Sequence, residues 1–262
     1  MHGSATAGRS PGTTRTLSNP ARLGRNVIVR VADRRLFCAW IEKGVDNRDA
    51  AVWAQWLDLD LAGRSLAPPQ RLADAGPTTW NLNAAIDDAG RAWVVFDATA
   101  GTRSDEIFLV SADDASASPV RLTDDDGVAS KYPDLAFGLD AAAVTWFDER
   151  DGNEEVYLAV APFPQLRNRF EAHARRVTPT VGASIGAYVA WNGGRVGLVW
   201  SDATGVALHA AERVTHNPTA SLIPAIQLWG DGFALAWNED VVEARGDHRS
   251  GGQSDIVFTT VD

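Results

Sequence analysis

The sequence predicts an all-β fold: a single five-bladed β-propeller built from four-stranded antiparallel blades. Three observations predict it. A short motif of Arg, then Leu or Val, then a small residue recurs along the chain. After about 24 residues each copy is followed by an apolar run that ends in a carboxylate, and two apolar stretches joined by a tight turn lie between them. Four short strands in a repeat of about 50 residues are typical of a propeller blade.

The elements of the repeat occur in the same order in each unit. We expect the first and second strands to be joined by turns rich in Gly, Asn and Asp, because these residues tolerate positive φ. The turns lie at residues 32–34, 87–90, 138–140, 192–194 and 230–232. The second strands end at Glu42, Asp97, Asp148, Asp202 and Glu239. The third strands are expected at residues 49–53, 105–108, 154–157 and 255–258.

The Arg-containing motif is expected to form the fourth strand of a blade. Its copies are Arg71-Leu72-Ala73, Arg121-Leu122-Thr123, Arg176-Val177-Thr178 and Arg213-Val214-Thr215. The fifth unit has no copy after its third strand, whereas the N-terminal part carries a further one at Arg15-Thr16-Leu17. We therefore expect residues 14–18 to complete the last blade and close the ring, which would hide both sheet edges. Residues 1–13 are expected to be a flexible tail, and residues 14–262 the propeller.

The third unit carries a longer motif. It reads Pro133-Asp134, then Asp148-Glu149-Arg150-Asp151-Gly152-Asn153, then Glu155-Val156-Tyr157, and finally Arg176-Val177-Thr178. This order resembles a TolB-type propeller repeat, which reads Pro-Asp, a hairpin, Asp-Arg-Asp-Gly-Asn, Glu-Ile-Tyr and Arg-Leu-Thr. The other units retain its skeleton, so the resemblance covers the chain from about residue 14 onward. It implies the propeller fold and no particular activity, because such repeats serve binding and catalysis alike.

The composition narrows the classes of partner. The chain of 262 residues has a formal net charge of −10, which argues against nucleic acid, because neutralising phosphates needs clustered Lys and Arg. No apolar run approaches the roughly 20 residues that span a bilayer, so we expect no membrane insertion. The only cysteine, Cys38, rules out an internal disulfide. The histidines lack metal-ligand spacing, so we expect no bound metal. Nothing resembles a nucleotide-phosphate loop, and we expect no cofactor. We also expect a monomer.

The beginning of the sequence bears on where the protein is found. Residues 1–12 are mostly small or polar and contain no apolar signal segment. We therefore expect either a cytoplasmic protein or a matured exported chain, and the residues do not distinguish these two localisations.

The first strands show a period of two. One face is apolar throughout, for example at Val27, Val29 and Val31, and predicts packing between blades. The opposite face carries polar side chains, which are most easily satisfied beside a hydrated channel or a ligand. Together with loop residues at the same rim, they give the candidate ligand-binding residues Asn26, Arg30, Trp80, Asn81, Asn83, Tyr132, Asp134, Tyr188, Gln227 and His248.

Several of these residues have a structural interpretation beside the functional one. The five carboxylates at the ends of the second strands form an acidic rim, but each is expected to cap its own following turn by accepting N–H bonds. Trp80 lies outside the register of the other strand tryptophans, which favours stacking on a ligand. His248 lies in a long loop with Glu243 and Asp247, and we expect it at the surface.

Three functions fit this pattern. In the first, the protein binds a small polar molecule or a glycan at the mouth of the central channel. In the second, it is an enzyme in which Asp134 acts as general acid or base, assisted by Tyr188 or Tyr132. Glycan cleavage would need a second carboxylate from the acidic rim, Glu243 or Asp247, whereas a cyclisation or isomerisation could use Asp134 alone. The third function is a protein–protein scaffold with an exposed apolar patch on one rim.

Overall fold

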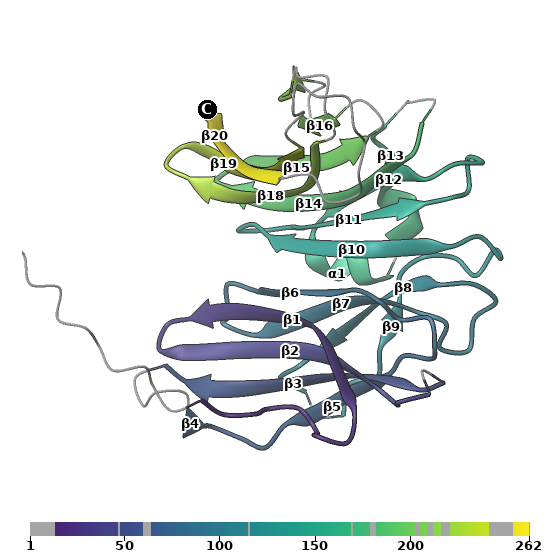
Figure 1. Ribbon diagram of the computed structural model, residues 1–262, viewed down its shortest axis with the longest axis vertical. Helices are drawn as coiled ribbons and strands as arrows, with labels where there is room; N and C mark the ends of the chain where they lie inside the picture. Colours follow the sequence, from purple (N-terminus) through teal and green to yellow (C-terminus); the bar gives the residue numbers. More distant parts are fainter. Residues whose placement is uncertain are drawn as a thin grey trace, which may run out of the picture.

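The computed structural model of the chain describes residues 14–46, 48–59, 64–114, 116–168, 170–178, 182–202, 205–208, 212–215, 221–240 and 254–261. In this part of the chain the strands form five antiparallel sheets, each built from consecutive strands. Figure 1 shows the sheets in chain order, with the first and the fifth at opposite ends of the row. The architecture is that of an all-β propeller, as the repeat predicts. The described part contains no helix that is long and apolar enough to cross a bilayer.

In four of the sheets the strands pair in the order of the chain, and in the first sheet β4 and β5 both pair with β3. The first sheet consists of β1 (Leu23–Ala32), β2 (Arg35–Lys43), β3 (Ala50–Asp58), β4 (Arg64–Ser65) and β5 (Gln70–Asp74). The second consists of β6 (Leu82–Ile86), β7 (Ala92–Ala98), β8 (Glu106–Ser111) and β9 (Val120–Arg121). The third consists of β10 (Ser130–Phe137), β11 (Ala142–Asp148), β12 (Glu155–Ala161) and β13 (Ala174–Arg176). The fourth consists of β14 (Ser184–Asn192), β15 (Arg195–Asp202), β16 (Gly205–Leu208) and β17 (Glu212–Arg213), and the fifth of β18 (Ser221–Trp229), β19 (Gly232–Asp240) and β20 (Ser254–Val261).

Tight turns join the first and second strands of all five sheets where Gly, Asn and Asp predict them. The two-residue turns each contain a residue with positive φ: Asp33 at 52°, Gly193 at 58° and Gly230 at 55°. The right-handed twist of the strands requires this backbone in a two-residue hairpin turn. The turn residues therefore set the register of each hairpin.

The third sheet carries a short helical insertion that the repeat does not predict. Helix α1 (Phe163–Asn168) and a 3-10 helix, η1 (Phe170–His173), connect β12 to β13. Phe163, Leu166 and Phe170 pack into the core between the second and third sheets. Their spacing places all three on one side of the insertion, so the insertion extends this core.

A repeated side-chain clamp explains the Arg-containing motif. In the second sheet, Thr123 Oγ1 donates a hydrogen bond to Glu106 Oε2 at 2.7 Å and accepts one from the N–H of Ile107 at 2.9 Å. In the third sheet, Thr178 bonds Glu155 and the following N–H in the same way. The threonine of the motif thus fixes the fourth strand to the acidic residue that begins the third strand.

The hydrophobic core lies between neighbouring sheets. The first strands of the second, third and fourth sheets bury their apolar face there, as the alternation predicts; Ala84 is 0% exposed, Leu135 3% and Val189 6%. The first sheet does not follow this prediction, because no sheet of the described part covers the same face of β1. The exposed fractions of its residues are large for apolar side chains: Val27 63%, Val29 46% and Val31 59%.

Residues 14–18 do not complete the last sheet. Among the described strands β20 pairs only with β19, and residues 14–18 form no strand. Leu17 instead packs on the first sheet against Cys38, and Arg15 Nη2 donates a hydrogen bond to Ser65 Oγ at 2.8 Å. The prediction that this segment closes the ring is therefore wrong: its apolar side chain, Leu17, is partly buried on the sheet that follows it in the chain.

The buried carboxyl of Glu106 in this clamp makes the stability of the fold depend on pH. Glu106 is fully buried, and desolvation raises its pKa from 4.5 to about 7. Between these values the folded protein keeps a proton that the unfolded chain has lost, so stability falls as the pH rises through this range.

In the variant Glu106→Gln an amide oxygen can still accept the hydrogen bond from Thr123. Because Gln does not ionise, we expect the variant to become more stable than the parent by about 1–3 kcal/mol as the pH rises past 7. Urea unfolding at about pH 5 and about pH 8 measures the effect. An equal difference between variant and parent at both pH values would contradict this prediction.

Candidate functional site

Four of the first strands bend at the same place. In β1, β10, β14 and β18 the register with the second strand shifts across two unpaired residues. The first of the two has positive φ: Asn26 at 45°, Tyr132 at 55°, Gly186 at 62° and Ile223 at 53°. A β-bulge of this kind bends the strand and re-aims the side chains beside it. Positive φ in Tyr132 and Ile223 stores strain, and such strain is concentrated at functional sites.

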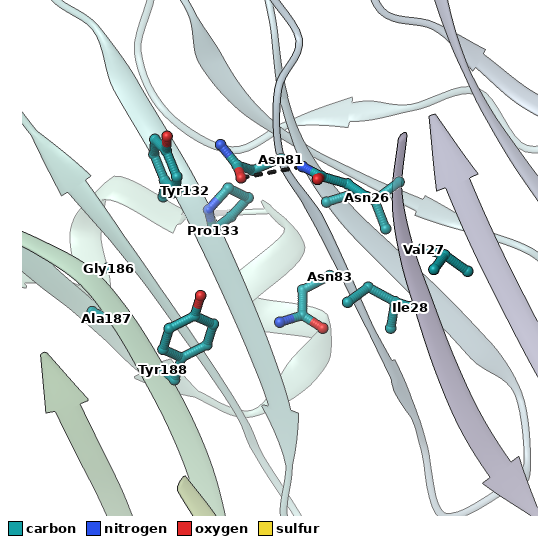
Figure 2. Close-up of a pocket in the computed structure, with 11 residues that line it drawn as sticks. Asn26, Val27, Ile28, Asn81, Asn83, Tyr132, Pro133, Gly186, Ala187 and Tyr188 are labelled. Atoms are coloured by element: carbon teal, nitrogen blue, oxygen red, sulfur yellow. Dashed lines mark hydrogen bonds between the residues drawn. The ribbon is translucent and has the colours of Figure 1, made fainter. Parts of the chain in front are cut away.

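A pocket of about 190 Å³ lies beside three of these bulges. Figure 2 shows Tyr132 and Asn81 at one end of the pocket and Tyr188 and Asn83 at the other. Its walls offer amide and phenol groups and contain no charged side chain, which suits a neutral polar ligand. The lining residues are Asn26, Val27, Ile28, Asn81, Leu82, Asn83, Tyr132, Pro133, Gly186, Ala187 and Tyr188.

Asp97, at the end of β7, holds two walls of the pocket in place. Its Oδ1 accepts hydrogen bonds from the N–H groups of Trp80 and Asn81 at 2.9 and 3.0 Å. Its Oδ2 accepts one from the side-chain amide of Asn81 at 3.3 Å and one from the N–H of Tyr132, in the next sheet, at 3.2 Å. Burial raises the pKa of this carboxyl, and the hydrogen bonds that it accepts oppose the rise. One carboxyl thus ties the segment before β6 to β10.

Asp134 lies behind the pocket, between β10 and β14. Its Oδ1 accepts a hydrogen bond from the N–H of Leu135 and its Oδ2 one from the N–H of Val189, both at 2.8 Å. Desolvation raises the pKa of Asp134 to about 6, while the charge of Arg30 acts in the opposite direction. A carboxyl with this pKa keeps its proton closer to neutral pH than an exposed Asp does, and it can donate that proton. The residue before it, Pro133, lines the pocket, but Asp134 is not among the lining residues.

Arg30 orients a polar side chain of the pocket. Its Nη2 donates to Asn83 Oδ1 and its Nε to the carbonyl of Ala84, both at 2.7 Å. Asn83 Oδ1 also accepts from the N–H of Ala84 at 2.8 Å. With the oxygen held in this way, the amide nitrogen of Asn83 points towards the side of Tyr188 (Figure 2).

Trp80 lies at the rim, and half of its surface is exposed. Its carbonyl accepts a hydrogen bond from the side-chain amide of Asn26, which connects it to the pocket. The Lys43 ammonium lies 4.1 Å and the Arg25 guanidinium carbon 5.2 Å from the centroid of the indole ring. Trp80 is not among the lining residues, so its stacking on a ligand stays a prediction.

The structure brings half of the candidate residues from the sequence to this pocket: Asn26, Asn81, Asn83, Tyr132 and Tyr188. Arg30 and Asp134 lie directly behind these residues, whereas Gln227 is exposed on β18 and does not line the pocket. His248, Glu243 and Asp247 lie outside the described residues.

The alternation of apolar and polar residues did not predict that Pro133 and Ala187 line the pocket, because it assigns both to the apolar face of their strands. Each directly follows a residue with positive φ, so the bulge and not the period of two decides where it lies. A proline inside a strand is a signal for a bulge, and Pro133 and Pro224 both occupy this position.

The rim carboxylates serve mainly as scaffold. Glu42 accepts a hydrogen bond from the N–H of Asn19 at 2.9 Å, and Asp148 accepts one from the hydroxyl of the first residue of β10 at 2.8 Å. Like Asp97, Glu42 binds the segment that leads into the first strand of its own sheet, and Asp148 binds the first residue of that strand; neither partner was predicted. Asp148 also caps its following turn, as predicted, by accepting from the N–H of Arg150 at 2.9 Å. The described residues contain no cluster of three or more side chains that could hold a metal ion.

Several solved structures share this fold. An α-L-arabinanase of Penicillium chrysogenum complexed with arabinobiose has a TM-score of 0.64 and 11% identity, over 90% of this chain and 76% of that chain. A GH93 α-L-arabinofuranosidase of Fusarium graminearum with arabinobiose has a TM-score of 0.62 and 13% identity, over 90% and 76%. A thermostable family-43 glycoside hydrolase has a TM-score of 0.53 and 11% identity, over 94% and 92%. No family model and no curated protein matches the sequence.

These structures correct the resemblance to TolB-type repeats. The structures that the chain resembles are an arabinanase, an arabinofuranosidase and a glycoside hydrolase, so the assignment to TolB-type proteins is wrong. The quoted stretch from Asp148 to Asn153 has a local explanation. It forms the turn between β11 and β12, in which the N–H of Gly152, at φ 92°, bonds the carbonyl of Glu149 at 2.9 Å. The shared motif therefore reflects what such a turn requires.

The role of Asp97 can be tested by removing one of its acceptors. In Asp97→Asn an amide nitrogen replaces an oxygen and faces the N–H groups that the oxygen bound, which should cost about 1–3 kcal/mol of stability. It should also weaken ligand binding, because Asn81 and Tyr132 lose their common anchor. Urea unfolding and calorimetric titration measure the two effects.

Asp87→Asn provides the matched control. Asp87 lies in the turn between β6 and β7 and accepts hydrogen bonds from Arg91 and Trp93. This turn is at the opposite end of the β6–β7 hairpin from Asp97. The Asp87→Asn variant should be less stable than the parent but should keep its affinity for the ligand. If both variants weakened binding equally, Asp97 would have no particular role in the pocket.

Proposed function

We propose that this protein binds a glycan in the pocket and cleaves a glycosidic bond there. The fold that it shares with an arabinanase and an arabinofuranosidase, both solved with arabinobiose, supports a short saccharide as the ligand. The amides and phenols of the lining supply the hydrogen bonds and the flat surfaces that a sugar needs.

The observation that carries the proposal is a pair of buried carboxyls next to the pocket. Asp97 and Asp134 are 1% and 5% exposed, and burial raises the pKa of both. Each bonds residues of the first strands around the pocket, Asp97 on one side of Tyr132 and Asp134 two residues further along β10. Glycoside cleavage uses two carboxyl groups, one of which keeps a proton for the leaving oxygen. Asp134 fits the acid, and Asp97 supplies the second carboxyl.

Turnover of arabino-oligosaccharides tests this function. We expect Asp134→Asn to lower kcat about 100-fold or more while leaving the affinity for the saccharide nearly intact. With the parent protein, kcat/KM should fall as the pH rises through about 6, because Asp134 must be protonated to act as the acid. Asp140→Asn, in the exposed turn after the same strand, is the control and should keep full activity.

A second candidate function is glycan binding without cleavage. One observation favours it: both oxygens of Asp134 accept backbone N–H groups, and neither Asp134 nor Asp97 is among the lining residues. Binding of a saccharide by a parent protein that shows no turnover on arabino-, xylo- and gluco-oligosaccharides would establish this candidate and overturn cleavage.

We also propose that the five sheets are the blades of one closed ring, in which the fifth sheet covers the exposed face of β1. The internal repeat supports this. Ile256 and Phe258 in β20 are 72% and 63% exposed, whereas Val156 and Leu158, at the same positions in the third sheet, are both 0% exposed. The fifth sheet thus has an apolar face of the kind that each of the preceding sheets packs on its neighbour.

Phe258→Ala tests the closed ring. If the fifth sheet covers β1, the variant should lose about 3–5 kcal/mol of stability, as buried Phe does. If the face stays exposed, the change should be within about 0.5 kcal/mol. Leu158→Ala, at the buried equivalent position, is the control and should lose about 2–5 kcal/mol in either case. Urea unfolding distinguishes the outcomes.

A further inference from the structure

A buried lysine lies beside the pocket without a carboxylate partner. Lys43, at the end of β2, is 0% exposed, and its ammonium donates a hydrogen bond to the carbonyl of Pro77 at 3.0 Å. Among the described residues it forms no ion pair; Asp97 and Asp105 act on it only at longer range. Buried lysines are rare unless they are paired. Desolvation, and then the charge of Arg25, lower the pKa of Lys43.

Arg25 brings a second positive charge to the same indole. The Arg25 side chain is exposed, and its guanidinium lies 5.2 Å from the centroid of the Trp80 ring, as the Lys43 ammonium does at 4.1 Å. Within the described residues Arg25 has no acidic partner. Two like charges at one ring repel each other, so an anion placed beside them would relieve this repulsion.

The pair adjoins the pocket directly. Arg25 precedes Asn26, whose side-chain amide bonds both the carbonyl of Trp80 and Asn81 Oδ1, the latter at 3.3 Å. Asn26, which lines the pocket, therefore links the pocket wall to Arg25 and Trp80.

We propose that Arg25, Lys43 and Trp80 form an anion subsite that takes the carboxylate of an acidic sugar unit, such as a hexuronate, next to the unit in the pocket. Arg25 binds the carboxylate directly with its forked donors, the exposed Trp80 supplies a flat surface for the sugar ring, and the buried Lys43 adds positive potential. This inference rests on the proposed function, because it assigns the second unit of the same glycan.

The net charge of −10 does not oppose such a ligand at contact distance. Charges further away than about 8 Å are largely screened at physiological ionic strength, so most of the acidic residues do not act at this place. Asp97 and Asp105 are near enough to act on Lys43, and neither forms an ion pair with it or with Arg25 within the described part of the chain. The overall charge slows the approach of an anion and leaves the contact itself favourable.

Calorimetric titration with matched disaccharides tests the subsite. The probes are a panel of disaccharides that carry one uronate unit, and the same disaccharides after the carboxyl has been reduced to an alcohol. We expect the acidic form to bind about tenfold more tightly at low salt, and the preference to shrink at high salt. Arg25→Gln should abolish the preference, and Arg25→Lys should restore part of it.

Arg35→Gln is the matched control. Arg35 also lies over a tryptophan, 4.3 Å from the Trp56 ring, but it is the first residue of β2, at the opposite end of the β1–β2 hairpin from Asn26. It should leave the preference unchanged. If the neutral forms bind as tightly as the acidic ones, the subsite is wrong while the proposed function stands. If no disaccharide of either form binds, the subsite is also wrong, and the turnover of arabino-oligosaccharides alone then decides the proposed function.

Discussion

A carboxyl group at the end of the second strand, bound to the segment that leads into the first strand, is the contact on which the pocket depends. That segment lies outside the sheet, so its N–H groups have no partner in a neighbouring strand. Asp97 supplies acceptors for two such groups and for a third in the next sheet. Two sheets are therefore positioned against each other by one side chain. One carboxyl therefore sets two walls of the pocket.

Much of the fold could be predicted from the sequence, because its elements have local causes. The hairpins follow from turn residues such as Asp33 and Gly193, which accept positive φ. The fourth strands follow from the Arg-containing motif, whose threonine bonds the acid of the third strand, as Thr123 bonds Glu106. These contacts join residues within one repeat unit. Each unit that forms them therefore carries the same short motif, which can be recognised in the sequence.

The remaining features depend on contacts between units or on departures from the period of two. Alternation places Pro133 in the core, but a bulge puts it in the pocket wall. The repeat count predicts that residues 14–18 pair with the last sheet, yet Leu17 finds an apolar surface on the first sheet. Half of the candidate residues line the pocket, because the polar face of the first strands faces it; that they bind a ligand stays a prediction. The buried acids behind them could not be placed from pattern alone.

The β-bulge shared by four of the first strands has a consequence for how such a protein evolves. The equivalent residues Asn26, Tyr132, Gly186 and Ile223 have four unrelated side chains on one backbone shape. Neither the local conformation nor the ladder of hydrogen bonds around it requires one particular amino acid. Mutations at these positions can therefore accumulate independently in each blade, and a lineage can exchange one ligand for another while it inherits the same scaffold.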